Sequence, residues 1–331
     1  MKPAHLIIGG LALAAALVLV TLFITAPHEP ERPMVYVVYD AGKGDLSYAD
    51  SAYRGLFSAQ ERLSFTKREF TNADRDRLPG LLQAAGGAER PGFIITIGYT
   101  YTDDTRRMAA ENPDIRFLAI DQSGNGGRNV QAYEITSYGE SYLAGVLAAT
   151  ASKTKHVGII LGTQSPLLEA FRQGFRDGVR AKDAPVRVDE AYVRDNSTEG
   201  FLDPVRGKEI ARSMYLDGAD VIYLAAGYSN TGAVAAAKEG PGRYVIGVDS
   251  DQTRLGPSVV LASAVKRLDR VVENGIETYL DGSFTGGETV AGLAEGVTGI
   301  VFNPRFESYN ATVRAWEPAA QEAELRYLAG R

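Results

Sequence analysis

The chain contains no cysteine and only three histidines among its 331 residues. The absence of cysteine excludes disulfide bonds, thiolate metal sites, cysteine nucleophiles and lipid attachment through a cysteine side chain. His5 and His28 flank a long apolar segment, and His156 begins a predicted strand, far from the strand ends where ligands bind. A serine hydrolase triad needs a histidine beside its nucleophile, so this class of enzyme is excluded.

Excess positive charge is also missing, because the formal net charge is −6 at pH 7. This sign argues against a partner of nucleic acid or anionic lipid. Hydrophobic residues make up 45% of the chain and charged residues 23%, which is typical of folded globular proteins. Because 331 residues are too many for one ordinary core, we expect two domains of about 150 residues each.

One long apolar run lies near the N-terminus. Residues 6–25 are apolar apart from two threonines, follow Lys2, and are long enough for one membrane crossing. The basic residue before the run and the acidic linker at residues 28–33 predict a chain whose body is extracytoplasmic, in the periplasm, and attached to the cell membrane. The run is longer than the roughly 7 to 15 residues of a signal-peptide core, which favours an uncleaved anchor. A cleaved signal peptide is the alternative.

From Met34 onward, short apolar runs alternate with helical patterns, which predicts a β-α series with parallel sheets. Several of the predicted strands end at polar residues. These strands and the residues that follow them are 35–39 with Asp40, 93–97 with Gly98, Tyr99 and Thr100, 116–120 with Asp121, and 245–248 with Asp249. Since the carboxyl ends of parallel strands face the ligand crevice of an open α/β sheet, these residues are candidate ligand contacts.

A further strand is predicted over residues 259–265, followed by Lys266 and an amphipathic helix over residues 268–280. Asp249 and Lys266 therefore follow consecutive strands, and we expect them to form a polar pair at one mouth of the sheet. This stretch is interpreted as the hinge side of a two-lobed binding protein.

Two successive β-α series predict an α/β protein of two similar lobes. The second series starts near residue 157, after a helix whose start carries a predicted capping box at Ser137–Glu140. We predict a first lobe of residues 34–135 with about 262–284, and a second lobe of residues 136–261 with about 285–331. Residues 1–33 form the anchor or signal segment and its linker. The tail after residue 302 has no clear pattern.

The glycine loop at residues 40–45 matches neither a nucleotide phosphate loop nor a dinucleotide fingerprint. Its two carboxylates are fewer than the oxygen ligands that calcium needs, which disfavours a calcium-dependent nucleoside hydrolase. Ligand contact and a simple tight turn that requires glycine both stay open for this loop. We predict no catalytic residue, no metal site and no cofactor.

Several segments together resemble the basic membrane protein family of extracytoplasmic ABC-transporter substrate-binding proteins, which includes purine nucleoside receptors. The segments are Asp40, Asp45, Ser47-Tyr48, Ser51-Ala52-Tyr53-x-Gly55-Leu56, Tyr142-Leu143-Ala144-Gly145-Val146, 207–211, 218–222, Ala225-Ala226-Gly227, 245–252 and Lys266-Arg267. The likeness covers roughly residues 35–301. It implies a type I periplasmic-binding fold, in which two Rossmann-like lobes joined by a hinge of three crossovers close on a nucleoside. It also implies ABC permease subunits as partners.

The resemblance assigns ligand-binding residues as well. They are Asp40, Tyr48, Asp121, Gly227, Tyr228, Asp249 and Lys266. By position in the family, Asp40 and Asp121 would bind the base or the sugar, and Tyr48 would stack on the purine. Gly227 and Tyr228 would lie in the loop opposite.

The resemblance also implies that Asp249 and Lys266 hold the ribose hydroxyls. This role suits their chemistry, because a carboxylate accepts hydrogen bonds and an ammonium group donates them. Structural alternatives stay open: a capping role for Asp249, a core position for Tyr48 and a solvated position for Lys266. Ala49 and Tyr228 depart from the family pattern, which usually has asparagine and glycine there. A sugar ligand, or a membrane-anchored sensor with the same fold, is the alternative function.

Overall fold

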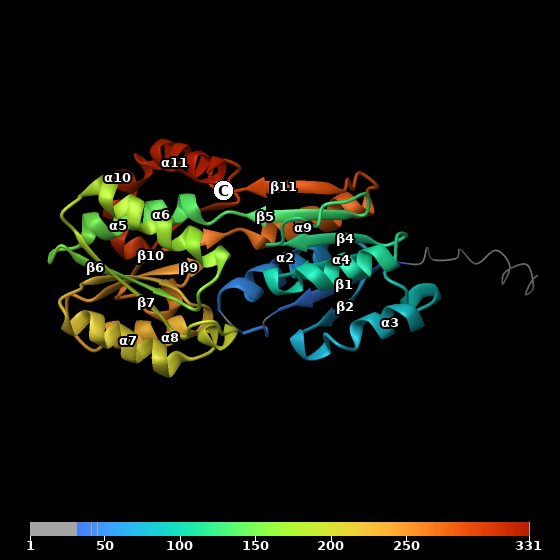
Figure 1. Ribbon diagram of the computed structural model, residues 1–331, viewed down its shortest axis with the longest axis horizontal. Coiled ribbons are helices and arrows are strands. Elements are labelled where there is room, and N and C mark those ends of the chain that lie inside the picture. Colours follow the sequence, from blue (N-terminus) through green and yellow to red (C-terminus); the bar gives the residue numbers. More distant parts are fainter. Residues whose placement is uncertain (1–31, 41, 45, 331) are drawn as a thin grey trace, which may run out of the picture. The chain divides into compact units, whose positions relative to one another are not determined.

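The computed structural model describes residues 32–40, 42–44 and 46–330 (Figure 1). The predicted membrane segment at residues 6–25 and Asp45 of the glycine loop lie outside these ranges. Within the described ranges, no helix is both long enough and apolar enough to cross a membrane. Residues from Pro33 onward form one compact unit.

The elements alternate between strands and helices, as the sequence predicts. The strands are β1 (Met34–Tyr39), β2 (Thr66–Phe70), β3 (Phe93–Ile97), β4 (Arg116–Ile120), β5 (Val130–Ile135), β6 (His156–Leu161), β7 (Arg187–Tyr192), β8 (Val221–Ala225), β9 (Tyr244–Asp249), β10 (Val260–Lys266), β11 (Gly287–Ala291) and β12 (Thr298–Phe302). The helices are α2 (Tyr48–Arg62), α3 (Leu78–Ala84), α4 (Thr102–Glu111), α5 (Tyr138–Ala151), α6 (Pro166–Lys182), α7 (Pro204–Leu216), α8 (Asn230–Ala237), α9 (Leu268–Leu280), α10 (Asn310–Arg314) and α11 (Glu317–Ala329).

The first sheet has the strand order β11-β5-β4-β3-β1-β2, and all of its neighbouring strands are parallel. Helices α2 and α9 cover one face, where Leu56 and Val272 share a buried cluster with Val37. Helices α3 and α4 cover the other face through Leu82 and Met108. Because helices bury both faces, β1 and β3 are largely apolar runs without alternation.

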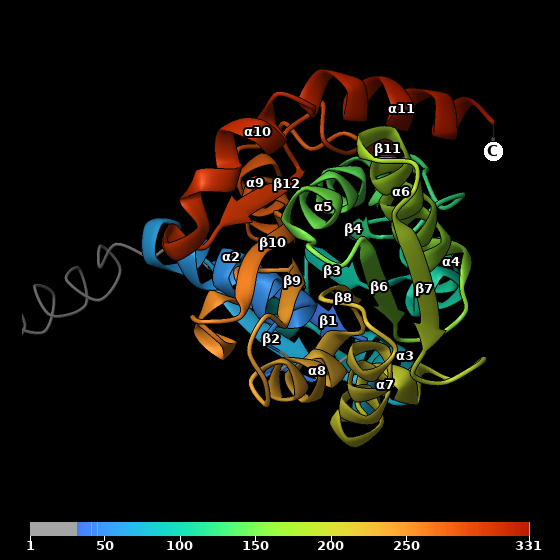
Figure 2. The same ribbon diagram turned by 90° about the vertical axis from the view of Figure 1, so that its left-hand side faces the viewer.

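The second sheet has the strand order β12-β10-β9-β8-β6-β7 and is parallel except for β12, which runs antiparallel to β10. Helices α5 and α6 cover one face and α7 and α8 the other (Figure 2). The prediction of an α/β protein with two similar lobes is therefore confirmed. In each lobe the carboxyl ends of the parallel strands carry the polar residues identified in the sequence.

The chain passes from one lobe to the other three times, between β5 and α5, between β10 and α9, and between β11 and β12. The sequence places the last two passages near residues 262 and 284. Instead, β10 continues in the second sheet as far as Lys266, and β11 pairs with β5 of the first sheet over Gly287–Ala291. The expected boundaries are displaced because long-range pairing, and not the strand's own sequence, determines which sheet a strand joins.

The capping box predicted at Ser137–Glu140 is wrong, although α5 does begin there. The Ser137 side chain makes no capping hydrogen bond, and Glu140 is fully buried. The amide of Gly139 instead donates to Glu324 Oε1 of α11, at 2.8 Å. A carboxylate from the far end of the chain thus takes a helix-terminal amide that a local pattern assigns to the helix itself.

The C-terminal tail, which has no clear pattern in the sequence, is helical in the structure. Helix α11 packs on α5, with Ala320 and Ala323 in the same buried cluster as the apolar side chains of α5 (Figure 2). Helix α5 is consequently covered by α6, α11 and the sheet, and almost every residue in it is buried. This packing brings α11 next to the passages between the lobes.

Candidate functional site

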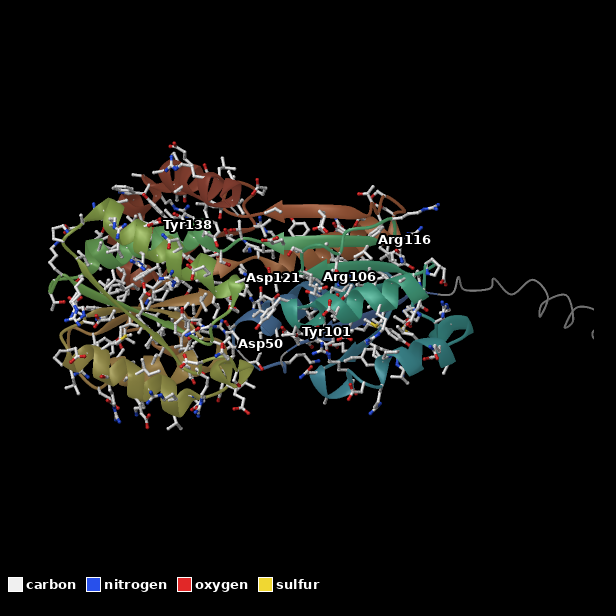
Figure 3. The ribbon with its side chains drawn as sticks, viewed as in Figure 1. Asp50, Tyr101, Arg106, Arg116, Asp121 and Tyr138 are labelled. Atoms are coloured by element: carbon white, nitrogen blue, oxygen red, sulfur yellow. The ribbon has the colours of Figure 1, made fainter. Side chains whose placement is uncertain are left out.

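A cavity of about 360 Å³ lies where the strand ends of the two lobes face each other. Residues of both lobes line it: Asp40, Tyr48, Asn72, Arg75, Gly98, Tyr99, Thr100, Leu167, Leu168, Phe171, Thr198, Phe201, Leu202, Ala225, Gly227, Tyr228, Val248, Asp249 and Lys266. Six of the seven predicted ligand-binding residues are among them. The seventh, Asp121, contacts the cavity-lining Lys266 and lies at the boundary between the lobes (Figure 3).

A larger hollow of about 820 Å³ lies on the second lobe between α6, α7 and the edge strand β7. Several of its charged side chains already have partners, as Glu190 does in Arg176. It contains none of the polar strand ends. The inter-lobe cavity is therefore the better candidate for a ligand site.

Lys266 and Asp121 form a buried ion pair between the lobes. Lys266 is the last residue of β10, and its Nζ donates to Asp121 Oδ2 at 2.8 Å, with side chains 2% and 1% exposed. Burial by itself lowers the pKa of the Lys266 ammonium, but the carboxylates of Asp121 and Asp249 outweigh burial and raise that pKa overall. Lys266 is therefore a fixed positive charge at the cavity wall.

Asp121 directly follows β4 and Asp249 ends β9, the equivalent strand of the second lobe, and the two residues have the same unusual backbone. Their φ angles are 56° and 61°, in the left-handed region that residues with a side chain rarely adopt. Asp121 Oδ1 accepts a hydrogen bond from the Ile135 amide at 3.2 Å, and Asp249 Oδ2 accepts one from Ser47 Oγ at 2.7 Å. Such conformations are concentrated at functional sites, where surrounding contacts hold them in place.

Tyr48 begins α2, directly after the glycine loop, and its ring lines the cavity. Burial, followed by the carboxylates of Asp121 and Asp40, raises the pKa of the Tyr48 hydroxyl well above its ordinary value. That hydroxyl comes near Asp121 without the geometry of a full hydrogen bond. Tyr48 is therefore a neutral aromatic wall with a hydroxyl beside two acids.

The remaining predicted residues lie on opposite sides of the cavity. Asp40 follows β1, and its Oδ2 accepts a long hydrogen bond of 3.5 Å from Thr100 Oγ1. Gly227 and Tyr228 form a short helical turn after β8, in the second lobe. Tyr228 is 39% exposed, which places it at the rim.

Several apolar residues of the second lobe line the cavity although they are not among the predicted ligand-binding residues, above all Phe171 and Phe201. Phe171 has the helical spacing of a core residue, and it does join the core cluster. Its ring also lies 5.4 Å from Lys266 Nζ, while the Tyr48 ring lies 5.7 Å from the same atom. Phe171 lies in the second turn of α6, and only four residues separate that helix from the end of β6. This closeness to a strand end is the signal that could have identified Phe171.

The cavity thus combines carboxylates, one ammonium group and aromatic rings from both lobes. No group of three or more potential metal-ligating side chains occurs in the part of the chain that the structure describes. His156 lies at the opposite end of β6, where its Nε2 contacts Asp189 Oδ2 at 2.7 Å. The groups present suit the binding of a small molecule with hydroxyl groups and a flat ring.

Comparison with protein families matches residues 33–319 to the Bmp family, described as ABC transporter substrate-binding protein PnrA-like. The chain is 32% identical over 286 residues to Basic membrane protein A1 of Borrelia garinii subsp. bavariensis, covering 84% of this chain and 82% of that protein. It is 32% identical over 274 residues to the ABC transporter nucleoside-binding protein BmpA of Lactococcus lactis subsp. cremoris, covering 77% of each. Among solved structures, an ABC transporter solute-binding protein from Aeropyrum pernix K1 superposes with a TM-score of 0.73 at 26% identity, covering 86% of this chain and 80% of that one.

Proposed function

Since this chain belongs to the Bmp family of PnrA-like ABC transporter substrate-binding proteins, we propose that it captures a nucleoside between its two lobes for import through an ABC permease. Members of this family bind substrates for transport. In this proposal the chain carries out no chemical reaction, and its partners are the ligand and the permease subunits.

The observation that carries the proposal is the convergence of acids, an ammonium group and aromatic rings on one inter-lobe cavity. Asp249 and Lys266 suit neighbouring ribose hydroxyls, because the carboxylate accepts hydrogen bonds and the ammonium donates them. The rings of Tyr48 and Phe171 suit the faces of a purine base. The cavity volume of about 360 Å³ is within the usual range for small-molecule sites.

The name of the Lactococcus lactis relative supports a nucleoside rather than a sugar, since that protein is described as nucleoside-binding and aligns with 77% of this chain. Asp40 and Asp121 are proposed to bind the base or the sugar, as the resemblance implies. Gly227 and Tyr228 are proposed to close the cavity from the second lobe.

The proposal extends to domain division and location. We assign residues 34–135 and about 268–291 to the first lobe, and the remainder from residue 136 to the second, with the three passages as the hinge of a type I periplasmic-binding fold. The protein is proposed to act outside the cytoplasm, held to the cell membrane by residues 6–25.

A ligand panel tests this function. The thermal midpoint of the full-length chain is measured with purine and pyrimidine nucleosides, free bases and sugars. A ligand at 100 times its Kd adds about 2.7 kcal/mol of stability. For a chain of this size that should raise the midpoint by about 4 °C, extrapolating from smaller domains. We expect a nucleoside, and neither a free base nor a free sugar, to give a shift of this size.

Asp249→Asn removes the negative charge that holds the ribose and should abolish the shift. Asp251→Asn is the matched control, because Asp251 is exposed two residues further on and does not line the cavity. A panel without any nucleoside response, or an Asp249→Asn variant that responds like the wild type, contradicts the proposed function.

A further inference from the structure

Two of the three passages between the lobes meet a single carboxylate from the C-terminal helix. Glu324 of α11 accepts hydrogen bonds from the amide of Gly139 at 2.8 Å and from the amide of Leu293 at 3.0 Å. Gly139 begins α5 just after the first passage, and Leu293 lies in the third passage. Helix α11 therefore joins two of the segments that must move if the lobes open.

A second carboxylate, Glu140, lies next to this junction and is completely buried. Neither of its oxygens has a hydrogen-bond partner among the described residues. The hydroxyls of Thr136 and Ser137 in the first passage, and of Thr298 directly after the third, are also buried without partners in that part of the chain. Buried polar groups are normally paired, so a cluster of unpaired ones at a hinge requires an explanation.

The titratable and charged groups that face Glu140 come from three elements. They are Glu324 of α11, Lys266 of β10 and Tyr223 of β8. The Thr298 hydroxyl of β12 comes near without the geometry of a full hydrogen bond. On α6, which packs along α5, Asp177 accepts a hydrogen bond from the Tyr138 hydroxyl at 2.6 Å. Figure 3 shows Tyr138 in the second lobe, at the start of α5.

These surroundings favour the neutral form of Glu140. Burial first, and then the negative charge of Glu324, raises the pKa of Glu140 to about 8, although Lys266 acts in the opposite direction. A buried carboxylate without hydrogen bonds is far less stable than the corresponding acid. Lys266 lines the ligand cavity whereas Glu140 does not, so Lys266 connects the charge of Glu140 to the ligand site.

We propose that Glu140 is a proton-binding site of the hinge, neutral while the lobes are closed and ionised when they open. In the closed state, a charged Glu140 has no hydrogen bonds and competes with Asp121 for the Lys266 ammonium, which joins the two lobes. Opening separates Asp121 from Lys266, so the ammonium is then left to stabilise the charge of Glu140. Closure over a ligand therefore takes up a proton; this last step rests on the proposed function.

The sign of the pH dependence is set by the raised pKa. The preference for the closed state is complete below the ordinary glutamate value of 4.5 and is lost as the pH rises to about 8. Within that window ligand affinity falls by at most about tenfold per pH unit, because one proton is involved.

The absence of cysteine allows a direct, ligand-free test. Spin labels are attached to Ala73→Cys on the first lobe and Val205→Cys on the second, both exposed positions outside the cavity lining. In the full-length chain, the fraction of molecules with a long inter-label distance should grow between about pH 5 and about pH 9. In the Glu140→Gln variant, which stays neutral, the fraction should not change with pH.

Glu322→Gln is the matched control, because Glu322 is an exposed carboxylate on α11, 71% accessible and paired with Arg326. It should keep the wild-type pH response. A Glu140→Gln variant that still responds to pH, or a wild-type distance distribution that does not respond, overturns the proposal. Infrared spectra of the wild type provide an independent check, since a protonated carboxylic acid band must be present near pH 6 and lost near pH 9.

A second arm separates this proposal from the proposed function. Adenosine and guanosine are titrated by calorimetry near pH 7 in two buffers of different ionisation enthalpy. We expect proton uptake of up to about one per nucleoside, abolished by Glu140→Gln. If these two and every other nucleoside of the panel fail to bind, the proposed function fails, while the label distances still decide the role of Glu140. Binding without proton uptake overturns the link between Glu140 and closure.

Discussion

The ion pair of Lys266 with Asp121 connects the lobes through two side chains that are 2% and 1% exposed. Each charge depends on the other, because a buried charge without its partner has lost its hydration and gained nothing in return. Asp121 has further support from the Ile135 amide, at 3.2 Å, whereas Lys266 Nζ has no second hydrogen bond in the described structure. The pair is therefore a point where stability and ligand binding depend on the same atoms.

Lys266→Met keeps most of the side-chain volume and leaves the Asp121 carboxylate buried without a cation. We expect the free energy of unfolding to fall by about 3 to 5 kcal/mol in urea titrations. The double variant Lys266→Met with Asp121→Asn should recover most of this loss, since neither half of the pair is then left charged without its partner.

An exposed ion pair is the control for this experiment. Arg314 and Glu317 form a 2.7 Å ion pair, and their side chains are 53% and 34% exposed. Arg314→Met breaks this pair and should lower the free energy of unfolding by less than about 1 kcal/mol. If Lys266→Met lowers the free energy of unfolding as little as Arg314→Met does, the Lys266–Asp121 pair does not stabilise the fold as the structure indicates.

Helices α5 and α6 pack so closely that their contact needs glycine. A Cβ on Gly178 of α6 would lie 2.0 Å from the backbone oxygen of Tyr142, and one on Gly174 would lie 2.3 Å from that of Tyr138. Glycine in the middle of a helix costs about 1 kcal/mol relative to alanine. Its presence here is explained by the backbone of α5, which occupies the space of the missing side chains.

Gly178→Ala should therefore destabilise the protein by about 1 to 3 kcal/mol in urea, despite the better helix propensity of alanine. Gly80→Ala in α3 is the matched control, because no atom lies within 4 Å of its Cβ position. That variant should gain up to about 1 kcal/mol. A neutral or stabilising Gly178→Ala would mean that α5 and α6 are further apart than the structure has them.

The two lobes also touch beside Asp249, which lines the cavity. Ser47 Oγ donates to Asp249 Oδ2 at 2.7 Å, and Ser250 Oγ donates to the Leu46 carbonyl oxygen at 2.9 Å. Residues 46 and 47 precede α2 in the first lobe, whereas Asp249 ends β9 in the second lobe and Ser250 follows it. These bonds exist only while the lobes are close together, so they stabilise the closed state.

We expect the double variant Ser47→Ala with Ser250→Ala to bind its nucleoside more weakly. Two hydrogen bonds of about 1 kcal/mol each correspond to a roughly 30-fold higher Kd. The change should lie mainly in the dissociation rate, which stopped-flow measurements provide.

Ser58→Ala is the control for the serine pair. Ser58 Oγ donates to Glu273 Oε1 at 2.8 Å within the first lobe, between α2 and α9. Its removal should leave the Kd within about twofold, because lobe closure neither forms nor breaks that bond. Equal effects of Ser58→Ala and the double variant would show that the contacts between the lobes do not govern affinity.

Local sequence determined the alternation of strands and helices and the polar residues at the strand ends. Strands buried on both faces must be continuous apolar runs, and the residue after each run then lies at the carboxyl edge of a parallel sheet. For this reason Asp40, Asp121, Asp249 and Lys266 could be identified as a group before any contact was known. Their separation in the chain, up to 226 residues from Asp40 to Lys266, did not matter, because parallel strands bring equivalent ends together.

Only the tertiary structure decided which sheet β11 joins, where α11 packs and that Glu140 is buried. The Ser-x-x-Glu pattern is the same at an exposed helix start and at a covered one, so it could not reveal that Glu324 would take the amide of Gly139. Phe171 likewise has the spacing of a core residue and is one, yet it also lines the cavity. These features depend on contacts between segments far apart in the chain, and a residue's own neighbours in sequence contain no information about which distant segment will cover it.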